Sequence, residues 1–306
     1  MGGILFEKIF YQNHIPCSPI VKACLASRFA LKSLIDPQNA QDVAVLDDLL
    51  SKFTLPIMKR RMENDPEGIR ILKTKPLLNS DQVNFEKLRK LPANTLGFAY
   101  FEFMDKYKLH MDSREPTHFL DDPTLAYILM RNRQLHDITH VAYGLNINLE
   151  AETAIKVIEF LQTGLPMPLL AIVGGLMRLP LVRIVVGKNS NVCNHENWKY
   201  ITSPIERKTA VNIGNLNINF DGNDTFMAQN GIGNDDEKLV QYPLKFSIKT
   251  LLPWAVRAGF KQKKPMYMVH VEDWFDKPLA DFKKYLGIQS LESNMYRYVS
   301  LKNDVL

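Results

Sequence analysis

The sequence predicts a mostly α-helical single domain that carries a small β-containing insertion. Apolar residues recur at helical spacing, after cap residues and prolines, through residues 1–186 and again through 242–288, which together form the expected helical core. Residues 187–241 are rich in Asn, Gly and Asp and form the insertion, and residues 289–306 form a C-terminal tail. A chain of 306 residues, 46% hydrophobic and 23% charged, can bury a substantial core.

Prolines and cap residues divide the N-terminal part into helices. A serine cap followed by a helix-opening proline predicts a helix from Pro19 to Ile35, which Asp36-Pro37 ends. A second helix is predicted from Ala40 to Met62, and Pro56 is expected to kink it or end it early. A turn is predicted at Asn64–Gly68 because this stretch combines Asn, Asp, Pro and Gly.

Three further cap signals mark helices in the middle of the chain. Asn94 is expected to cap an aromatic-rich helix at Thr95–Tyr107. Asp121-Asp122-Pro123 is expected to cap the helix that carries a pair of histidines. Asn148 is a natural N-cap for a helix at Leu149–Gln162.

The most apolar run of the chain extends from Leu165 to Val186. Prolines and arginines interrupt it, so no stretch reaches the roughly 20 apolar residues that a transmembrane helix needs. It is expected to form a buried or interfacial helix pair.

The insertion contains the only clear β signal. Val211–Phe220 alternates apolar and polar residues with a change of phase near Gly214, which predicts a strand with a bulge or the edge of a hairpin. An exposed strand edge can pair with another chain, so the insertion is more typical of a docking arm than of a catalytic element. Cys193 and His195 lie close enough to bind a metal, but two residues make a weak case.

Charge and cysteine content restrict the class of partner. The net charge of +5 permits contact with an anionic membrane surface and gives no reason to expect nucleic acid. Cys17, Cys24 and Cys193 form no CxxC motif, so a reducing compartment is expected. Residues 8–35 contain basic but no acidic side chains, which is compatible with a mitochondrial presequence or with an ordinary basic helix.

Two histidines and two carboxylates cluster between residues 135 and 152. On a helix, His136 and His140 are i,i+4 neighbours and can share a ligand, while Asp137 lies on the same arc. The following turn can return Glu152 to the same place, giving the ligand types of a zinc site. The alternative is a solvated helix in which the aspartate pairs with a nearby arginine, Arg131 or Arg133.

The spacing of these residues is that of a known family. His136-Asp137-x-x-His140, eleven residues and Glu152 form the HDxxH-x11-E pattern of the coenzyme Q (ubiquinone) biosynthesis protein 4 family, which the chain resembles. Other family-like segments cover about residues 18–186 and 242–288. They are Asp65–Leu72, Leu91–Tyr100, Asp112-Ser113-Arg114, Asp121–Tyr127, Gly164–Met167 and Leu252–Ala255.

The resemblance implies a mostly helical protein on the matrix face of the mitochondrial inner membrane. It implies that His136, Asp137, His140 and Glu152 bind zinc or another divalent metal, with a decarboxylase or lyase-type activity at C1 of the quinone precursor. It also implies a scaffolding role among other ubiquinone-biosynthesis proteins and contact with inner-membrane lipids. A dimer with itself or a related chain is plausible from the family.

A polyprenyl lipid or quinone precursor needs a long apolar groove. Leu169, Leu170, Ile172, Val173, Leu176 and Met177 could line one, or could be ordinary core residues. Arg178 could meet a lipid phosphate or be an ordinary surface charge.

Residues 187–241 have no expected counterpart in the resembled family. They favour an alternative function, an accessory subunit of a respiratory-chain assembly such as NADH:ubiquinone oxidoreductase (complex I) that retains the lipid pocket. The complete metal motif favours the biosynthetic function, because metal-ligand residues tend to be replaced by other residues once catalysis is lost.

Overall fold

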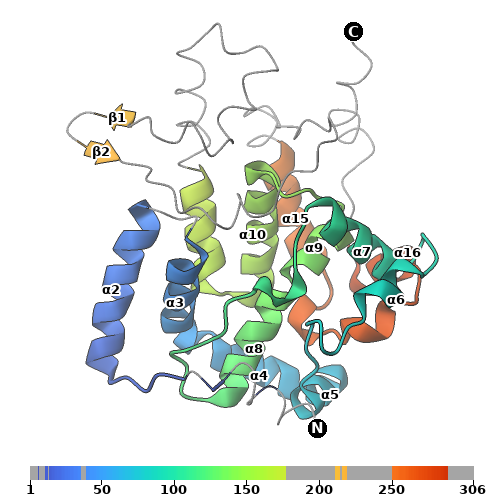
Figure 1. Cartoon of the computed structure of the whole chain (residues 1–306), viewed down its shortest axis with the longest axis horizontal. Helices are drawn as coiled ribbons and strands as arrows, with labels where there is room; N and C mark the ends of the chain where they lie inside the picture. The colour runs from blue at the N-terminus through green and yellow to red at the C-terminus, as the bar shows by residue number, and fades with distance from the viewer. Residues whose placement is uncertain are drawn as a thin grey trace, which may run out of the picture.

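The chain folds as a bundle of helices in a computed structural model, which describes residues 6, 11–12, 14–35, 39–176, 211–213, 216–218 and 250–288 (Figure 1). The predicted mostly α-helical class is confirmed. The named helices are α2 (Pro19–Ile35), α3 (Ala40–Leu50), α4 (Leu55–Glu63), α5 (Pro66–Thr74), α6 (Phe85–Arg89), α7 (Leu96–Lys106), α8 (Pro123–Gln134), α9 (His136–Tyr143), α10 (Leu149–Thr163), α15 (Leu252–Lys261) and α16 (Leu279–Leu286). Short 3₁₀ turns lie at Ser51–Phe53, Met111–Ser113, Met266–Met268 and Val271–Trp274.

The N-terminal helices follow the cap signals with two differences. Helix α2 has the predicted bounds, but the predicted 40–62 helix is two helices separated by a 3₁₀ turn. Pro56 lies in the first turn of α4, where its missing N–H costs nothing, and so it starts a helix rather than kinking one. The turn predicted at Asn64–Gly68 is wrong in extent, because Asp65 accepts a hydrogen bond from the Gly68 N–H and starts α5 at Pro66.

The caps in the middle of the chain are correct except at α7. The Asp122 side chain accepts from the N–H groups of Thr124 and Leu125, and the Asn148 side chain accepts from that of Ala151. Thr95 rather than the expected Asn94 caps α7. The helix capped by Asp122 ends at Gln134, so the histidine pair lies on a separate helix, α9.

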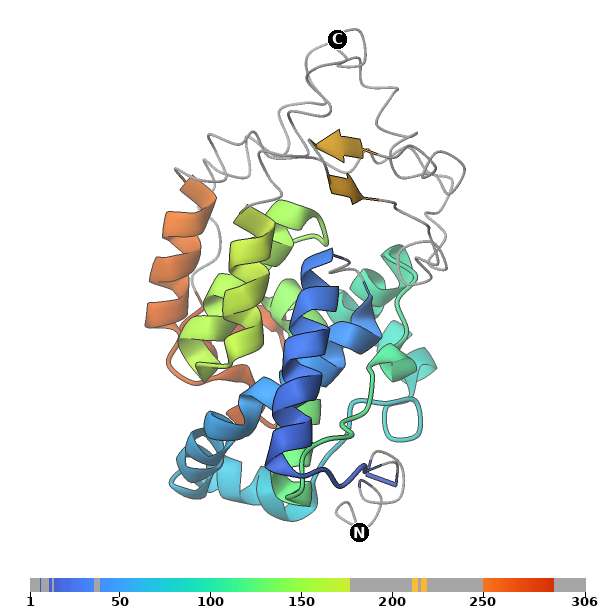
Figure 2. The same ribbon diagram turned by 90° about the vertical axis from the view of Figure 1, so that its left-hand side faces the viewer.

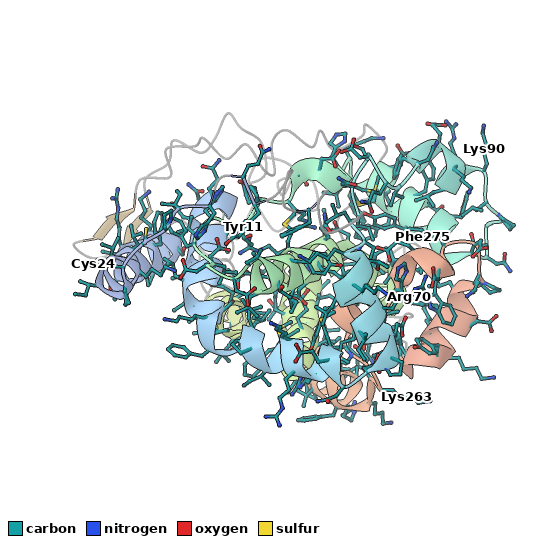
Figure 3. The ribbon with its side chains drawn as sticks, turned by 90° about the horizontal axis from the view of Figure 1, so that it is seen from below. Tyr11, Cys24, Arg70, Lys90, Lys263 and Phe275 are labelled. Atoms are coloured by element: carbon teal, nitrogen blue, oxygen red, sulfur yellow. The ribbon has the colours of Figure 1, made fainter. Side chains whose placement is uncertain are left out.

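The C-terminal segment at residues 266–277 contacts two helices from the first half of the chain, α5 and α7. The N–H groups of Leu96 and Gly97 donate to the carbonyls of Lys277 and Phe275. Arg70 on α5 pairs with Asp273, and Figure 3 shows Arg70 and Phe275 where these two segments lie side by side. The segment therefore closes the bundle through backbone and charge contacts.

Residues 166–176 form a further helix that packs against α10, with α2 nearby in the side view (Figure 2). Gly175 lies so close to Thr153 of α10 that a Cβ atom would come within 2.6 Å of the threonine hydroxyl. A glycine is therefore needed where the two helices meet. In the part of the chain that the structure describes, no helix is both long and apolar enough to cross a membrane.

The β signal corresponds to a two-stranded antiparallel pair. Strands β1 (Val211–Ile213) and β2 (Leu216–Ile218) pair Val211 with Ile218 and Ile213 with Leu216, which is a hairpin. The rest of 187–241, the tail 289–306 and the predicted site residues Met177, Arg178, Cys193 and His195 lie outside the described residues.

Candidate metal centre

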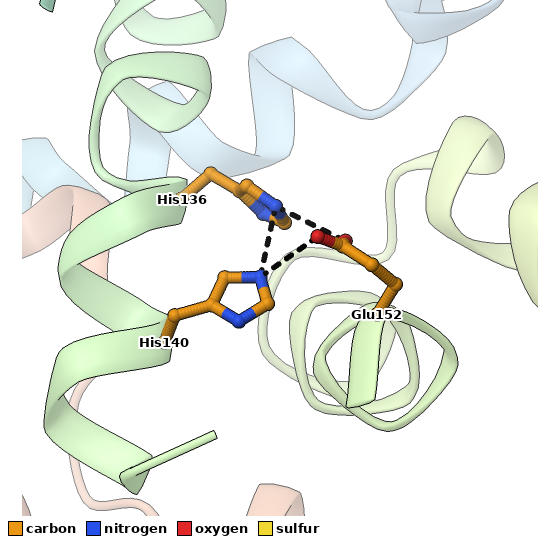
Figure 4. A group of neighbouring side chains, drawn as sticks. All are labelled: His136, His140 and Glu152. Atoms are coloured by element: carbon orange, nitrogen blue, oxygen red, sulfur yellow. Dashed lines mark hydrogen bonds and ion pairs between the residues drawn. The ribbon is translucent and has the colours of Figure 1, made fainter. Parts of the chain in front are cut away.

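Two consecutive helices bring the motif residues together. Helix α9 places His136 and His140 on one face, one turn apart. Gly144 ends α9 in the left-handed conformation with φ 69°, and Asn148 then starts α10. The chain reverses over this short turn, so Glu152 in the first turn of α10 faces both imidazoles (Figure 4).

The three side chains form a compact triangle of possible metal ligands. His136 Nε2 and His140 Nε2 are 3.2 Å apart. His136 Nε2 lies 3.3 Å from Oε2 of Glu152, and His140 Nε2 lies 3.3 Å from the other oxygen, Oε1. Two donors bonded at about 2.0–2.1 Å to one tetrahedral ion lie about 3.3 Å apart. Two nitrogens and a carboxylate at this spacing therefore fit the protein ligands of a zinc-like divalent metal.

The triangle is buried on one side and open on the other. The His140 side chain has no exposed surface and that of His136 is 11% exposed, whereas that of Glu152 is 33% exposed. Water or a substrate could reach a metal held here from the side of Glu152. An open position is what separates a catalytic metal site from a closed structural one.

A second carboxylate and a lysine lie behind His136. The Nδ1 atom of His136 is 2.7 Å from Oε1 of Glu159, and Lys156 Nζ is 2.8 Å from Glu159 Oε2. Burial and Lys156 oppose a charge on His136, but Glu159 and Glu152 outweigh them and raise its pKa to about 8.

Nearby cations lower the pKa of both glutamates, the buried Glu159 and the partly exposed Glu152. Burial raises the pKa of Glu159, but Lys156 and His136 outweigh it and lower the value to about 2. Burial likewise opposes ionisation of Glu152, yet His140 and His136 hold the pKa of that carboxyl well below its usual value. The site therefore presents fixed negative charge to a cation.

Asp137, the fourth predicted ligand, points elsewhere. Its carboxylate is 2.5 Å from Nη2 of Arg114, and it does not belong to the group of side chains that could share an ion. An aspartate–arginine pair was the alternative expectation, but with Arg131 or Arg133. Those two arginines instead bind Glu272 and the pair Asp47 and Asp48.

Five of the seven predicted lipid-binding residues lie on the helix at 166–176, and the other two lie outside the described residues. Leu169, Leu170, Val173 and Leu176 are 37–49% exposed, while Ile172 packs into a core cluster formed with α10 and α15. This helix contacts Thr153, the neighbour of Glu152, through Gly175. The helix that carries the exposed apolar side chains and the histidine–glutamate triangle therefore both contact α10, at neighbouring residues.

Sequence reasoning missed Lys156 and Glu159. They follow Glu152 at i+4 and i+7, so helical spacing alone puts all three on the face of α10 that meets α9. Arg114 was also missed as a partner of the motif, because its contact with Asp137 joins residues 23 positions apart.

Known proteins are similar in sequence to this chain over more than half of its length. Residues 11–185 match the model of the family described as "Coenzyme Q (ubiquinone) biosynthesis protein Coq4". A "Ubiquinone biosynthesis protein COQ4 homolog, mitochondrial" from Plasmodium falciparum is 33% identical, over 95% of this chain and 97% of that protein. The protein of that name from Bos taurus is 39% identical, over 56% of this chain and 64% of that protein. Residues 187–241 fall inside the span aligned with the Plasmodium protein, so they do not separate this chain from every family member.

A solved structure shares the fold. The crystal structure of a Nostoc punctiforme protein, provisionally described as a ubiquinone biosynthesis protein, superposes with a TM-score of 0.52. The match covers 88% of this chain and 97% of that one at 17% sequence identity, and therefore speaks to the fold alone. Together with the family match over residues 11–185, these relatives establish that the chain belongs to the Coq4 family of coenzyme Q (ubiquinone) biosynthesis proteins.

Proposed function

We propose that this protein acts in mitochondrial ubiquinone biosynthesis by holding a divalent metal, with zinc the first candidate, next to a bound polyprenyl quinone precursor. His136, His140 and Glu152 are the protein ligands. The observation that carries the proposal is the convergence of these three side chains. The two Nε2 atoms are 3.2 Å apart, each is 3.3 Å from a different oxygen of the Glu152 carboxylate, and the Glu152 side chain is partly exposed.

The chemistry proposed is loss of the C1 carboxyl group from the aromatic head group of the precursor. A bound divalent metal supplies Lewis-acid polarisation of a phenol or carboxylate oxygen. Because zinc has no redox chemistry, an oxidative form of this reaction needs a separate oxidant to accept two electrons. His136, His140 and Glu152 would hold the metal. Lys156 balances the charge of Glu159, and Arg114 balances that of Asp137.

The polyprenyl tail is proposed to lie along the helix at 166–176. Leu169, Leu170 and Val173 expose apolar surface there, and the helix meets α10 beside Glu152. A tail on this stripe would bring its head group toward the metal ligands.

We also propose a peripheral position on the matrix face of the inner membrane, with a scaffolding role among other biosynthetic proteins. The mitochondrial names of the Plasmodium and bovine relatives support the compartment. Residues 187–241 suggested the accessory-subunit alternative, but they fall inside the span aligned with the Plasmodium ubiquinone-biosynthesis protein, which supports the biosynthetic function instead.

Metal content tests the central claim. Elemental analysis of the purified chain is expected to find about one divalent metal per protein, and His140→Ala is expected to remove it. His110→Ala, which changes an exposed histidine outside the triangle, is the matched control and should keep the metal. A wild-type protein purified without metal, and unable to bind added zinc, would refute the proposal.

Lipid content tests the second part. Val173→Gln is expected to reduce the prenyl lipid that co-purifies, and Ile57→Gln, at an equally exposed apolar position on α4, should not. Equal lipid in all three proteins, measured by extraction and mass spectrometry, would argue against a binding stripe at 166–176.

A further inference from the structure

The two imidazoles of the metal centre differ in what holds their outer nitrogens. His136 Nδ1 is 2.7 Å from Glu159 Oε1. His140 Nδ1 has no hydrogen-bond partner among the described residues, and its ring instead stacks on Phe103 with centroids 5.7 Å apart and 28° between the planes. One ligand is therefore oriented by a carboxylate and the other by packing.

We propose that Glu159, held in turn by Lys156, is the positioning residue of the metal centre, accepting the Nδ1 proton of His136 and directing Nε2 toward the shared metal. This inference rests on the proposed metal binding. It assigns a role to two residues outside the HDxxH-x11-E pattern.

Hydrogen-bond chemistry fixes where the proton lies. An ionised carboxylate can only accept, so the 2.7 Å contact requires a hydrogen on His136 Nδ1. Lys156 Nζ is closer to Glu159 Oε2, at 2.8 Å, than to His136 Nδ1, at 3.3 Å. The ammonium therefore donates to the second carboxylate oxygen and leaves the first for the histidine.

Burial makes this arrangement effective. Glu159 is 8% exposed, so little water competes for its oxygens. With Nδ1 protonated, the lone pair of a neutral His136 lies on Nε2, which faces His140 Nε2 and Glu152. A carboxylate behind a histidine ligand fixes its tautomer and ring orientation and raises its basicity.

The helix geometry shows why one element can supply both functions. Glu152, Lys156 and Glu159 are spaced i, i+4 and i+7 and occupy the side of α10 that meets α9. Glu152 contacts Nε2 of His136 and Glu159 contacts Nδ1, so side chains of α10 contact both nitrogens of the same imidazole ring. A shift of α10 relative to α9 would disturb the ligand and its support together.

Two substitutions of Glu159 separate charge from hydrogen bonding. In Glu159→Gln the amide oxygen can still accept the Nδ1 proton but the negative charge is gone, whereas Glu159→Ala removes both. Zinc affinity of the full chain can be measured by competition with a chromophoric chelator. The zinc dissociation constant of Glu159→Ala is expected to be roughly 10- to 100-fold larger than that of the wild type. Glu159→Gln should fall between that value and the wild type. The visible spectrum of the Co²⁺-loaded protein should change in both.

A matched control removes a comparable buried charge elsewhere. Glu272→Gln loses a carboxylate that pairs with buried Arg131 and does not touch the triangle, so its zinc affinity and Co²⁺ spectrum should equal those of the wild type. Wild-type zinc affinity and spectrum in Glu159→Ala would overturn the positioning role while leaving the metal centre intact. A wild type that binds no zinc, or a His140→Ala variant that binds it normally, would instead refute the metal centre itself. Glu159→Gln is isosteric and decides the question if Glu159→Ala does not fold.

Discussion

Two buried charge clusters lie on the consecutive helices α8 and α9, and they balance their carboxylates in different ways. On α8, Arg131 is fully buried and donates to the carbonyls of Pro76 and Val269 and to both oxygens of Glu272. On α9 and α10, Glu152 and Glu159 face two histidines and one lysine. The first cluster contains a permanent cation for its carboxylate. In the second, Lys156 pairs with Glu159 alone, and Glu152 depends on a protonated histidine or on a bound metal.

The difference separates a structural role from a binding role. An arginine stays charged at every physiological pH and its planar guanidinium matches a carboxylate, so the α8 cluster fixes the C-terminal segment against the bundle. Imidazoles bind protons and metals exchangeably in this range. The α9 cluster is therefore suited to exchanging the cation that its histidines share with Glu152.

The largest expected effect comes from removing the permanent cation. Arg131→Met leaves Glu272 and two backbone carbonyls without their donor, and the free energy of unfolding should fall by about 3–5 kcal/mol. Chemical denaturation measures the loss. Arg70→Met is the control, because Arg70 and Asp273 are 53% and 41% exposed, and water weakens such exposed pairs, so the loss of stability should be much smaller. Equal losses in the two variants would show that Arg131 does not lock the fold.

Local patterns made most of the fold predictable. Helix boundaries at α2 and α10 follow from prolines, an asparagine cap and a glycine end, all of which act within a few residues. The threading of 266–277 past α5 and α7 could not be predicted, because contacts such as Arg70 with Asp273 join positions 203 residues apart. The break at Leu135 was also missed, because helical periodicity continues across it.

Short-range spacing also predicted most of the metal site, and long-range packing explains the part of the site that was missed. His136, His140 and Glu152 lie within one helix–turn–helix, where spacing determines proximity. Asp137 lies between the histidines in sequence, yet its side chain turns to Arg114, which the sequence gives no reason to select over Arg131 or Arg133. Spacing finds groups that can converge, and packing determines which of them do.

A smaller effect is expected at Asp137 and would sharpen the division between structure and binding. Asp137→Asn weakens the charged hydrogen bond with Arg114, so the free energy of unfolding should fall by about 1.5–3 kcal/mol. Zinc affinity should stay at the wild-type value because Asp137 lies outside the group of side chains that could share an ion. Loss of zinc binding in a variant that melts like the wild type would instead make Asp137 part of the metal site.

The smallest effect is the pH dependence of the permanent cluster. Burial opposes ionisation of Glu272, but Arg131 outweighs it and lowers the pKa of that carboxyl below its ordinary 4.5. A carboxyl with a lowered folded-state pKa stabilises the fold above its unfolded pKa and loses this contribution as pH falls through the folded value. The difference in unfolding free energy between the wild type and Glu272→Gln should therefore be constant from pH 7 to about 5 and shrink only below about 4.5. Urea titrations across this range measure it. A difference that already shrinks between pH 7 and 5.5 would contradict a cluster held by a permanent cation.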